Sequence, residues 1–144
     1  MAIGQVSLYF RTSIKGKHMM LNCLYVGIGG FIGSIMRYLF SLMPFFERMT
    51  FPAATLTVNA LGGLIIGVFY ALTGHYAGLN GGWTLFVQIG ICGGFTTFSA
   101  FSLESIKLLE SGRVGIMLIY ILASVIICLC TVWLGKTGMD YLLK

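Results

Sequence analysis

The stretch from residue 93 to residue 102, GGFTTFSAFS, gathers side chains that could handle ions within an otherwise apolar chain. Hydroxyl groups can replace water around a small anion, and the electropositive edges of phenylalanine rings can face an anion without trapping it. If a helix is interrupted here, freed carbonyls suit a cation and freed N–H groups suit an anion. The pattern therefore indicates an ion site or ion pathway, and an aromatic packing cluster is the alternative.

Several polar residues elsewhere could contribute to the same chemistry. Asn59 lies four residues after Thr55, so both share a helix face, and its amide has two donors and an acceptor to satisfy. Tyr120, Ser124 and Thr131 form a second stripe, which indicates either ordinary interhelical hydrogen bonds or part of a pathway.

Two charged residues, Arg37 and Glu104, lie within or next to the apolar stretches. Arg37 either extends to the membrane surface or stands in a water-filled vestibule, where it would attract anions. We expect Glu104 to play a structural role, satisfying a helix end or pairing with Lys107 at i,i+3.

The elements that position these residues are predicted to be membrane helices. Apolar residues make up 58% of the chain and charged residues only 9%, and no Lys, Arg, Asp or Glu occurs between Arg48 and Glu104. The composition predicts an all-α integral membrane protein. Charges and helix breakers place four spans near residues 21–43, 53–73, 83–110 and 114–135, with the third interrupted near Gly93-Gly94.

The rest of the chain is simpler. Residues 21–144 are predicted to form one four-helix membrane domain, and residues 1–20 a basic N-terminal extension that is surface-lying or disordered. The four cysteines lie inside spans with no CxxC motif, which is typical of small core residues. The net charge of +5 comes from scattered basic residues, which argues against a nucleic-acid interface.

Three features point towards self-association. Lys and Arg are divided almost evenly between the two sides of the membrane, so the charge bias hardly selects an orientation. Four short helices can hardly enclose a pathway and keep a packed core, whereas two copies could. The motifs Gly29-x-x-x-Gly33 and Gly63-x-x-x-Gly67 predict close helix contacts, either within one subunit or between two.

The string GGFTTFSAFS, preceded by FPAATLTVNALGG (51–63) and GGFIGSIMRY (29–38), strongly resembles the fluoride channel family called Fluc or CrcB. The resemblance covers roughly residues 22–135. It implies an antiparallel, dual-topology homodimer in a bacterial inner (cell) membrane, with two fluoride pathways and a structural sodium ion at the dimer centre.

The resemblance also implies a role for each matching residue. The backbone carbonyls of Gly93 and Thr96 would bind sodium, Phe98 and Phe101 would form an aromatic box, and Asn59 would contact the box or the ion. Ala100 stands where many relatives carry a hydroxyl. Further polar contacts along the pathway would come from Arg37, Thr55, Thr97, Ser99, Tyr120 and Ser124.

The function predicted is a fluoride-selective passive channel, and not an enzyme. Hydrogen fluoride crosses membranes as a neutral acid and dissociates in the less acidic cytoplasm; a channel lets the membrane potential drive the trapped anion out and so relieves its toxicity. The alternative is a small dual-topology multidrug exporter, which depends on a carboxylate in the first span, and residues 21–43 contain none. A second alternative is a membrane scaffold that transports nothing. Such a protein would not need Asn59, the interrupted helix and the series of hydroxyl side chains together.

Overall fold

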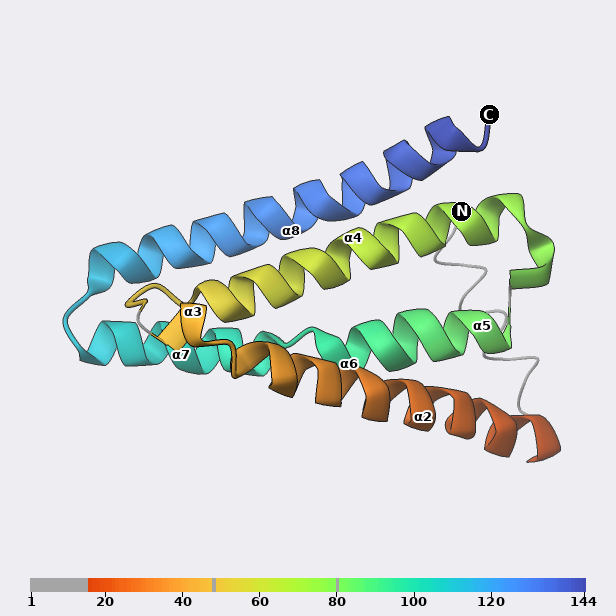
Figure 1. Ribbon diagram of the computed structural model, residues 1–144, viewed down its shortest axis with the longest axis horizontal. Coiled ribbons are helices and arrows are strands. Elements are labelled where there is room, and N and C mark those ends of the chain that lie inside the picture. The colour runs from red at the N-terminus through yellow and green to blue at the C-terminus, as the bar shows by residue number, and fades with distance from the viewer. Residues whose placement is uncertain (1–15, 48, 80) are drawn as a thin grey trace.

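A computed structural model describes residues 16–47, 49–79 and 81–144, and every regular element in these ranges is helical (Figure 1). The long helices are α2 (Gly16–Ser41), α4 (Ala53–His75) and α8 (Val114–Leu142). The third span comprises α5 (Gly82–Thr84), the π-helix η2 (Leu85–Cys92), α6 (Gly93–Phe95) and α7 (Phe98–Glu110). Two short elements, α3 (Pro44–Glu47) and η1 (Ala77–Leu79), lie in the connections.

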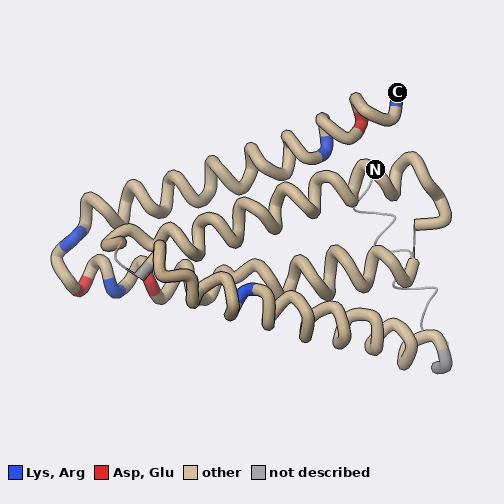
Figure 2. The backbone as a smooth tube through the Cα atoms, viewed as in Figure 1, with Lys and Arg blue, Asp and Glu red and all other residues tan. Residues whose placement is uncertain are grey.

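Four segments are long and apolar enough to cross a membrane: His18–Ser41, Ala53–His75, Gly82–Glu110 and Val114–Leu142. Their number agrees with the prediction from the charge pattern. Most charged residues lie towards the two ends of the bundle, while one basic position lies near the middle of α2 (Figure 2). Most large apolar side chains are exposed, including Phe31, Leu122 and Leu129, as expected when lipid or another subunit covers them.

Two span ends differ by more than two residues from those read off the sequence. The first helix begins at Gly16, so residues 16–20 of the predicted extension are helical, whereas residues 1–15 lie outside the described part of the chain. The fourth helix continues beyond residue 135 to Leu142. Asp140 in its last turns accepts a hydrogen bond from Lys136 Nζ of the same helix at 2.8 Å and one from His75 Nε2 of α4 at 3.2 Å.

The helices pack as two pairs, α4 along α8 and α2 along the first half of the third span (Figure 1). Close approach at glycines makes both pairs possible. A Cβ added at Gly33 would lie 2.8 Å from the Phe95 backbone nitrogen, and one added at Gly67 would lie 2.9 Å from that of Lys136. The two GxxxG motifs therefore serve contacts within one chain.

Candidate functional site

The third span loses helical geometry at two residues near its middle. Thr96 (φ −79°, ψ 156°) and Thr97 (φ −150°, ψ 117°) are extended, and α7 begins at the next residue. Gly93 has helical dihedrals (φ −64°, ψ −36°), so the extended residues lie beyond the glycine pair where the sequence placed the interruption. We call Thr96 and Thr97 the extended pair.

Asn59 of α4 holds the backbone of the extended pair from one side. Its Nδ2 donates to the Thr97 carbonyl at 3.1 Å, and its Oδ1 accepts from the Thr97 N–H at 2.8 Å. One amide side chain thereby replaces two helical hydrogen bonds that an extended residue cannot make. A contact between Asn59 and the aromatic box or an ion stays a prediction.

The threonine side chains complete the two helix ends. Thr96 Oγ1 donates to the Cys92 carbonyl at 2.8 Å, which also accepts from the Thr96 N–H at 2.9 Å. Thr97 Oγ1 accepts from the Ala100 N–H at 3.1 Å, an N-cap for α7, and lies 3.0 Å from Ser99 Oγ. Ala100 lacks a hydroxyl yet supplies this backbone donor.

Two carbonyls next to these groups are left without a hydrogen bond among the described residues: those of Gly93 and Thr96. The Thr97 N–H, which would serve Gly93 in a continuous helix, goes to Asn59 instead. Gly93 is exposed, and a Cβ built on it meets nothing within 4 Å. Carbonyl oxygens without a hydrogen-bond partner are the kind of ligand that a hard cation such as sodium prefers.

Glu104 of α7 is the centre of a second polar cluster. Its Oε1 accepts from Thr55 Oγ1 at 2.7 Å, and its Oε2 accepts from the Tyr120 hydroxyl at 2.7 Å. The carboxylate thus connects α4, α7 and α8. The expected pair with Lys107 is wrong, because within the described ranges the recorded salt bridges are His75–Asp140 and Lys136–Asp140.

Sequence reasoning missed the position of Glu104 in this cluster. Its two partners lie 49 and 16 residues away along the chain. The available signal was Thr55, which shares a helix face with Asn59 and so faces the third span.

The predicted residues of the fourth span differ in what surrounds them. Tyr120 is fully buried, while the Ser124 hydroxyl, one turn further on, is buried without a hydrogen-bond partner among the described residues. Thr131 donates to the Cys128 carbonyl of its own helix at 3.0 Å. Ser124 therefore has an unused donor, whereas Thr131 does not.

The two predicted ring residues lie in contact but are covered unequally. The ring centroids of Phe98 and Phe101 are 5.4 Å apart, and the Phe101 ring lies 5.2 Å from that of Tyr120. Phe101 is half-buried, whereas Phe98 is 78% exposed. The Phe98 ring is therefore largely uncovered within a single chain, and an aromatic box stays a prediction.

Arg37 reaches inward from α2 and donates from Nε to the Gly94 carbonyl at 3.1 Å. It lines a cavity of about 400 Å³ rather than extending into lipid, and a role for this cavity as a water-filled vestibule stays a prediction. The cavity also contains Glu104 and the predicted residues Thr55 and Thr97. The complete lining is Ser34, Arg37, Tyr38, Ser41, Ala54, Thr55, Val58, Thr97, Ala100 and Glu104.

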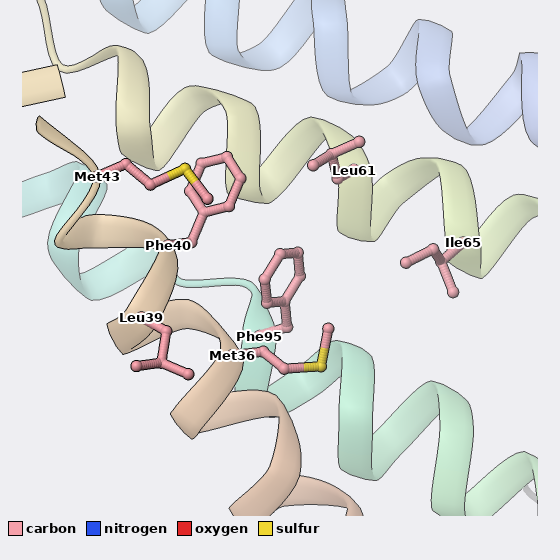
Figure 3. Close-up of a pocket in the computed structure, with 7 residues that line it drawn as sticks. All are labelled: Met36, Leu39, Phe40, Met43, Leu61, Ile65 and Phe95. Carbon is pink, nitrogen blue, oxygen red and sulfur yellow. The ribbon is translucent and has the colours of Figure 1, made fainter. Parts of the chain in front are cut away.

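A separate apolar groove of about 390 Å³ lies between α2 and α4, with the ring of Phe95 between them (Figure 3). None of the predicted site residues lines it. The groove is formed by Met36, Leu39, Phe40, Met43, Leu61, Ile65 and Phe95.

Residues 24–136 match the family model described as CrcB-like protein, Camphor Resistance (CrcB). The chain belongs to the CrcB family. The match includes the extended pair, Asn59, Arg37 and the Glu104 cluster. This protein is accordingly a multi-pass membrane protein, and its four candidate spans are those of a CrcB chain.

Curated relatives agree along most of their length. A protein of Phocaeicola vulgatus named fluoride-specific ion channel FluC is 44% identical over 117 residues, which cover 81% of this chain and 96% of the relative. Proteins with the same name from Rhodospirillum rubrum and Saccharophagus degradans are 40% and 41% identical over 121 residues. These matches cover 82% and 84% of this chain, and 94% and 91% of the relatives.

The hydrogen-bond pair at Asn59 leads to a prediction. Asn59→Asp keeps the acceptor for the Thr97 N–H but replaces the donor to the Thr97 carbonyl with an oxygen. We expect this variant to lose about 1–3 kcal/mol of unfolding free energy, measured by denaturation of the purified protein in detergent. Thr57→Val is the matched control, because Thr57 donates only to Ala53 of its own helix. Equal stability of N59D and wild type would refute the role of Asn59.

Proposed function

We propose that this CrcB protein is a fluoride-selective passive ion channel through which cytoplasmic fluoride leaves down its electrochemical gradient. The observation that carries the proposal is the close similarity, across all four spans, to relatives named fluoride-specific ion channels. A passive channel needs no catalytic group, so the protein is proposed not to be an enzyme. The exporter alternative is disfavoured because residues 21–43 contain no carboxylate.

The route proposed for the anion follows the polar groups beside the interruption. Entry would be through the cavity that Arg37 lines, where a cationic side chain raises the local anion concentration. The hydroxyls of Thr97 and Ser99, the unused Ser124 donor and the ring edges of Phe98 and Phe101 would then take the place of water. Thr55 and Tyr120 would act through Glu104, which both contact.

A structural sodium ion is proposed at the carbonyls of Gly93 and Thr96. Their lack of hydrogen-bond partners among the described residues supports this assignment. The ion would supply positive charge that offsets the carbonyl dipoles. Within the chain, Asn59 and the threonine side chains already hold the backbone that presents these oxygens.

An antiparallel homodimer is proposed because one chain leaves the site unfinished. Phe98 is 78% exposed although it belongs to the predicted box. Gly93 has ordinary helical dihedrals and open space at its Cβ position, so nothing within one chain requires glycine there. A second copy packed against the extended pair would cover the ring and approach the glycine closely.

The channel proposal predicts passive fluoride efflux. Purified protein in liposomes, with sodium on both sides, should release fluoride when potassium and valinomycin impose an inside-negative potential, and a fluoride electrode should record it. Empty liposomes and chloride-loaded proteoliposomes are the controls. Absence of protein-dependent fluoride release, or equally fast chloride release, would rule out a fluoride-selective channel.

The aromatic box predicts a loss of flux when a ring is removed. Phe98→Ile and Phe101→Ile each remove ring edges worth about 0.5–1.5 kcal/mol, so we expect up to about a tenfold slower fluoride efflux in the same assay. Phe31→Ile is the matched control, since Phe31 is also highly exposed but lies outside the site. The box is excluded if the Phe98 and Phe101 variants conduct like F31I.

The antiparallel dimer predicts two orientations in one membrane. A cysteine added after Lys144, in a chain whose native cysteines are replaced by alanine, should react with a membrane-impermeant maleimide at about half its copies in intact cells. The remaining copies should react only after permeabilisation. Labelling confined to one side of the membrane would contradict dual topology.

A further inference from the structure

The carbonyl of Gly94 loses its helical partner at the extended pair. In a continuous helix it would accept the N–H of residue 98, but Thr96 and Thr97 are extended and displace that group. An unpaired carbonyl at this depth of a membrane protein needs another donor. The donor here is Arg37 Nε, at 3.1 Å.

The packing of α2 explains why Arg37 can reach this carbonyl. A Cβ added at Gly94 would lie 2.5 Å from the Gly30 carbonyl oxygen, so the two backbones are in direct contact. Arg37 lies seven residues after Gly30, two turns further along the same face of α2. Its side chain therefore faces the third span rather than lipid.

The positive charge of Arg37 lies beside a backbone carbonyl rather than in a salt bridge. Arg37 and Glu104 line one cavity, yet the structure records no salt bridge between them in the ranges it describes. Glu104 instead uses both oxygens on hydroxyl groups. The guanidinium lies at the carbonyl end of the first half-helix, where positive charge is favourable.

We propose that Arg37 is a positioning residue that fixes the Gly94 carbonyl from α2, as Asn59 fixes Thr97 from α4. The two side chains hold the backbone on either side of Phe95 and Thr96. The residues adjoining the two free carbonyls, those of Gly93 and Thr96, are thereby anchored. This role is additional to any effect of the positive charge on anions in the cavity.

Two substitutions separate the positioning role from the charge. The amide nitrogen of glutamine occupies the same place along the side chain as arginine Nε, so Arg37→Gln keeps the donor and removes the charge. Arg37→Lys keeps a charge but puts a methylene at the Nε position. Positioning predicts that glutamine substitutes well and lysine poorly, whereas a purely electrostatic role predicts the reverse.

Hydrogen–deuterium exchange of peptides covering residues 92–100 measures this directly, in purified protein and sodium-free buffer. We expect R37Q to exchange like wild type and R37K to exchange roughly tenfold faster, as loss of a charged hydrogen bond implies. Ser41→Ala is the matched control, because Ser41 lines the same cavity but donates to Tyr38 of its own helix. Normal elution and helix content of each variant are required.

The outcomes decide between the two roles. Fast exchange in R37Q with slow exchange in R37K would overturn the positioning role in favour of charge. Wild-type exchange in both variants would overturn it altogether. If only R37K fails to fold, Arg37→Met, which lacks both the donor and the charge, takes its place and is expected to exchange fast.

The same peptides test whether the anchoring matters for sodium, a step that rests on the proposed function. Sodium is titrated in place of N-methylglucamine. It should slow hydrogen–deuterium exchange at similar sodium concentrations in wild type and R37Q. In R37K, the same effect should need a several-fold higher sodium concentration. Equal sodium dependence in all three would separate Arg37 from the cation site. No effect of sodium on wild type would refute the sodium proposal and leave the sodium-free comparison valid.

Discussion

The backbone groups released by the extended pair depend on partners other than lipid, because lipid offers no hydrogen bonds. The rest of the site follows from this constraint. Asn59 serves both the N–H and the carbonyl of Thr97, Arg37 serves Gly94, and the threonine hydroxyls cap the two helix ends. The carbonyls of Gly93 and Thr96 stay without a hydrogen-bond partner among the described residues, because the Thr97 and Ala100 N–H groups that would serve them in a continuous helix go to Asn59 and to the Thr97 hydroxyl.

One face of α4 joins the extended pair to the Glu104 cluster. Thr55 donates a hydrogen bond to the Glu104 carboxylate. Asn59, one turn later on the same helix, donates to the Thr97 carbonyl. The carboxylate in turn holds Tyr120 of α8, whose ring packs on Phe101. Short polar contacts thus connect four segments that are distant in sequence, in addition to the close backbone packing at the glycines.

The sequence was sufficient to predict the four spans, because charges and breakers mark the ends of apolar runs. An interruption of the third span near Gly93-Gly94 stays a prediction, and the extended residues Thr96 and Thr97 lie beyond this pair. The glycines were read as breakers, whereas Gly93 is helical and Gly94 allows close approach to Gly30. The partners of Glu104 and Arg37 could not be predicted, since these hydrogen bonds join residues that only the packed helices bring together. The end of α8 was missed because Lys136 was read as a boundary, although its pairing with Asp140 continues the helix.

The π-helical stretch Leu85–Cys92 leads directly into this region. Its hydrogen bonds join residues five apart rather than four, so each such turn accommodates one residue more than an α-helical turn. This stretch therefore holds spare length. A one-residue deletion within the π-helical stretch could be accommodated by a change to α-helical turns. The same deletion within α6 or the extended pair would displace Thr97 from Asn59. The spare length therefore lies on the approach to the site, whereas the register of Thr97 opposite Asn59 leaves no residue to lose.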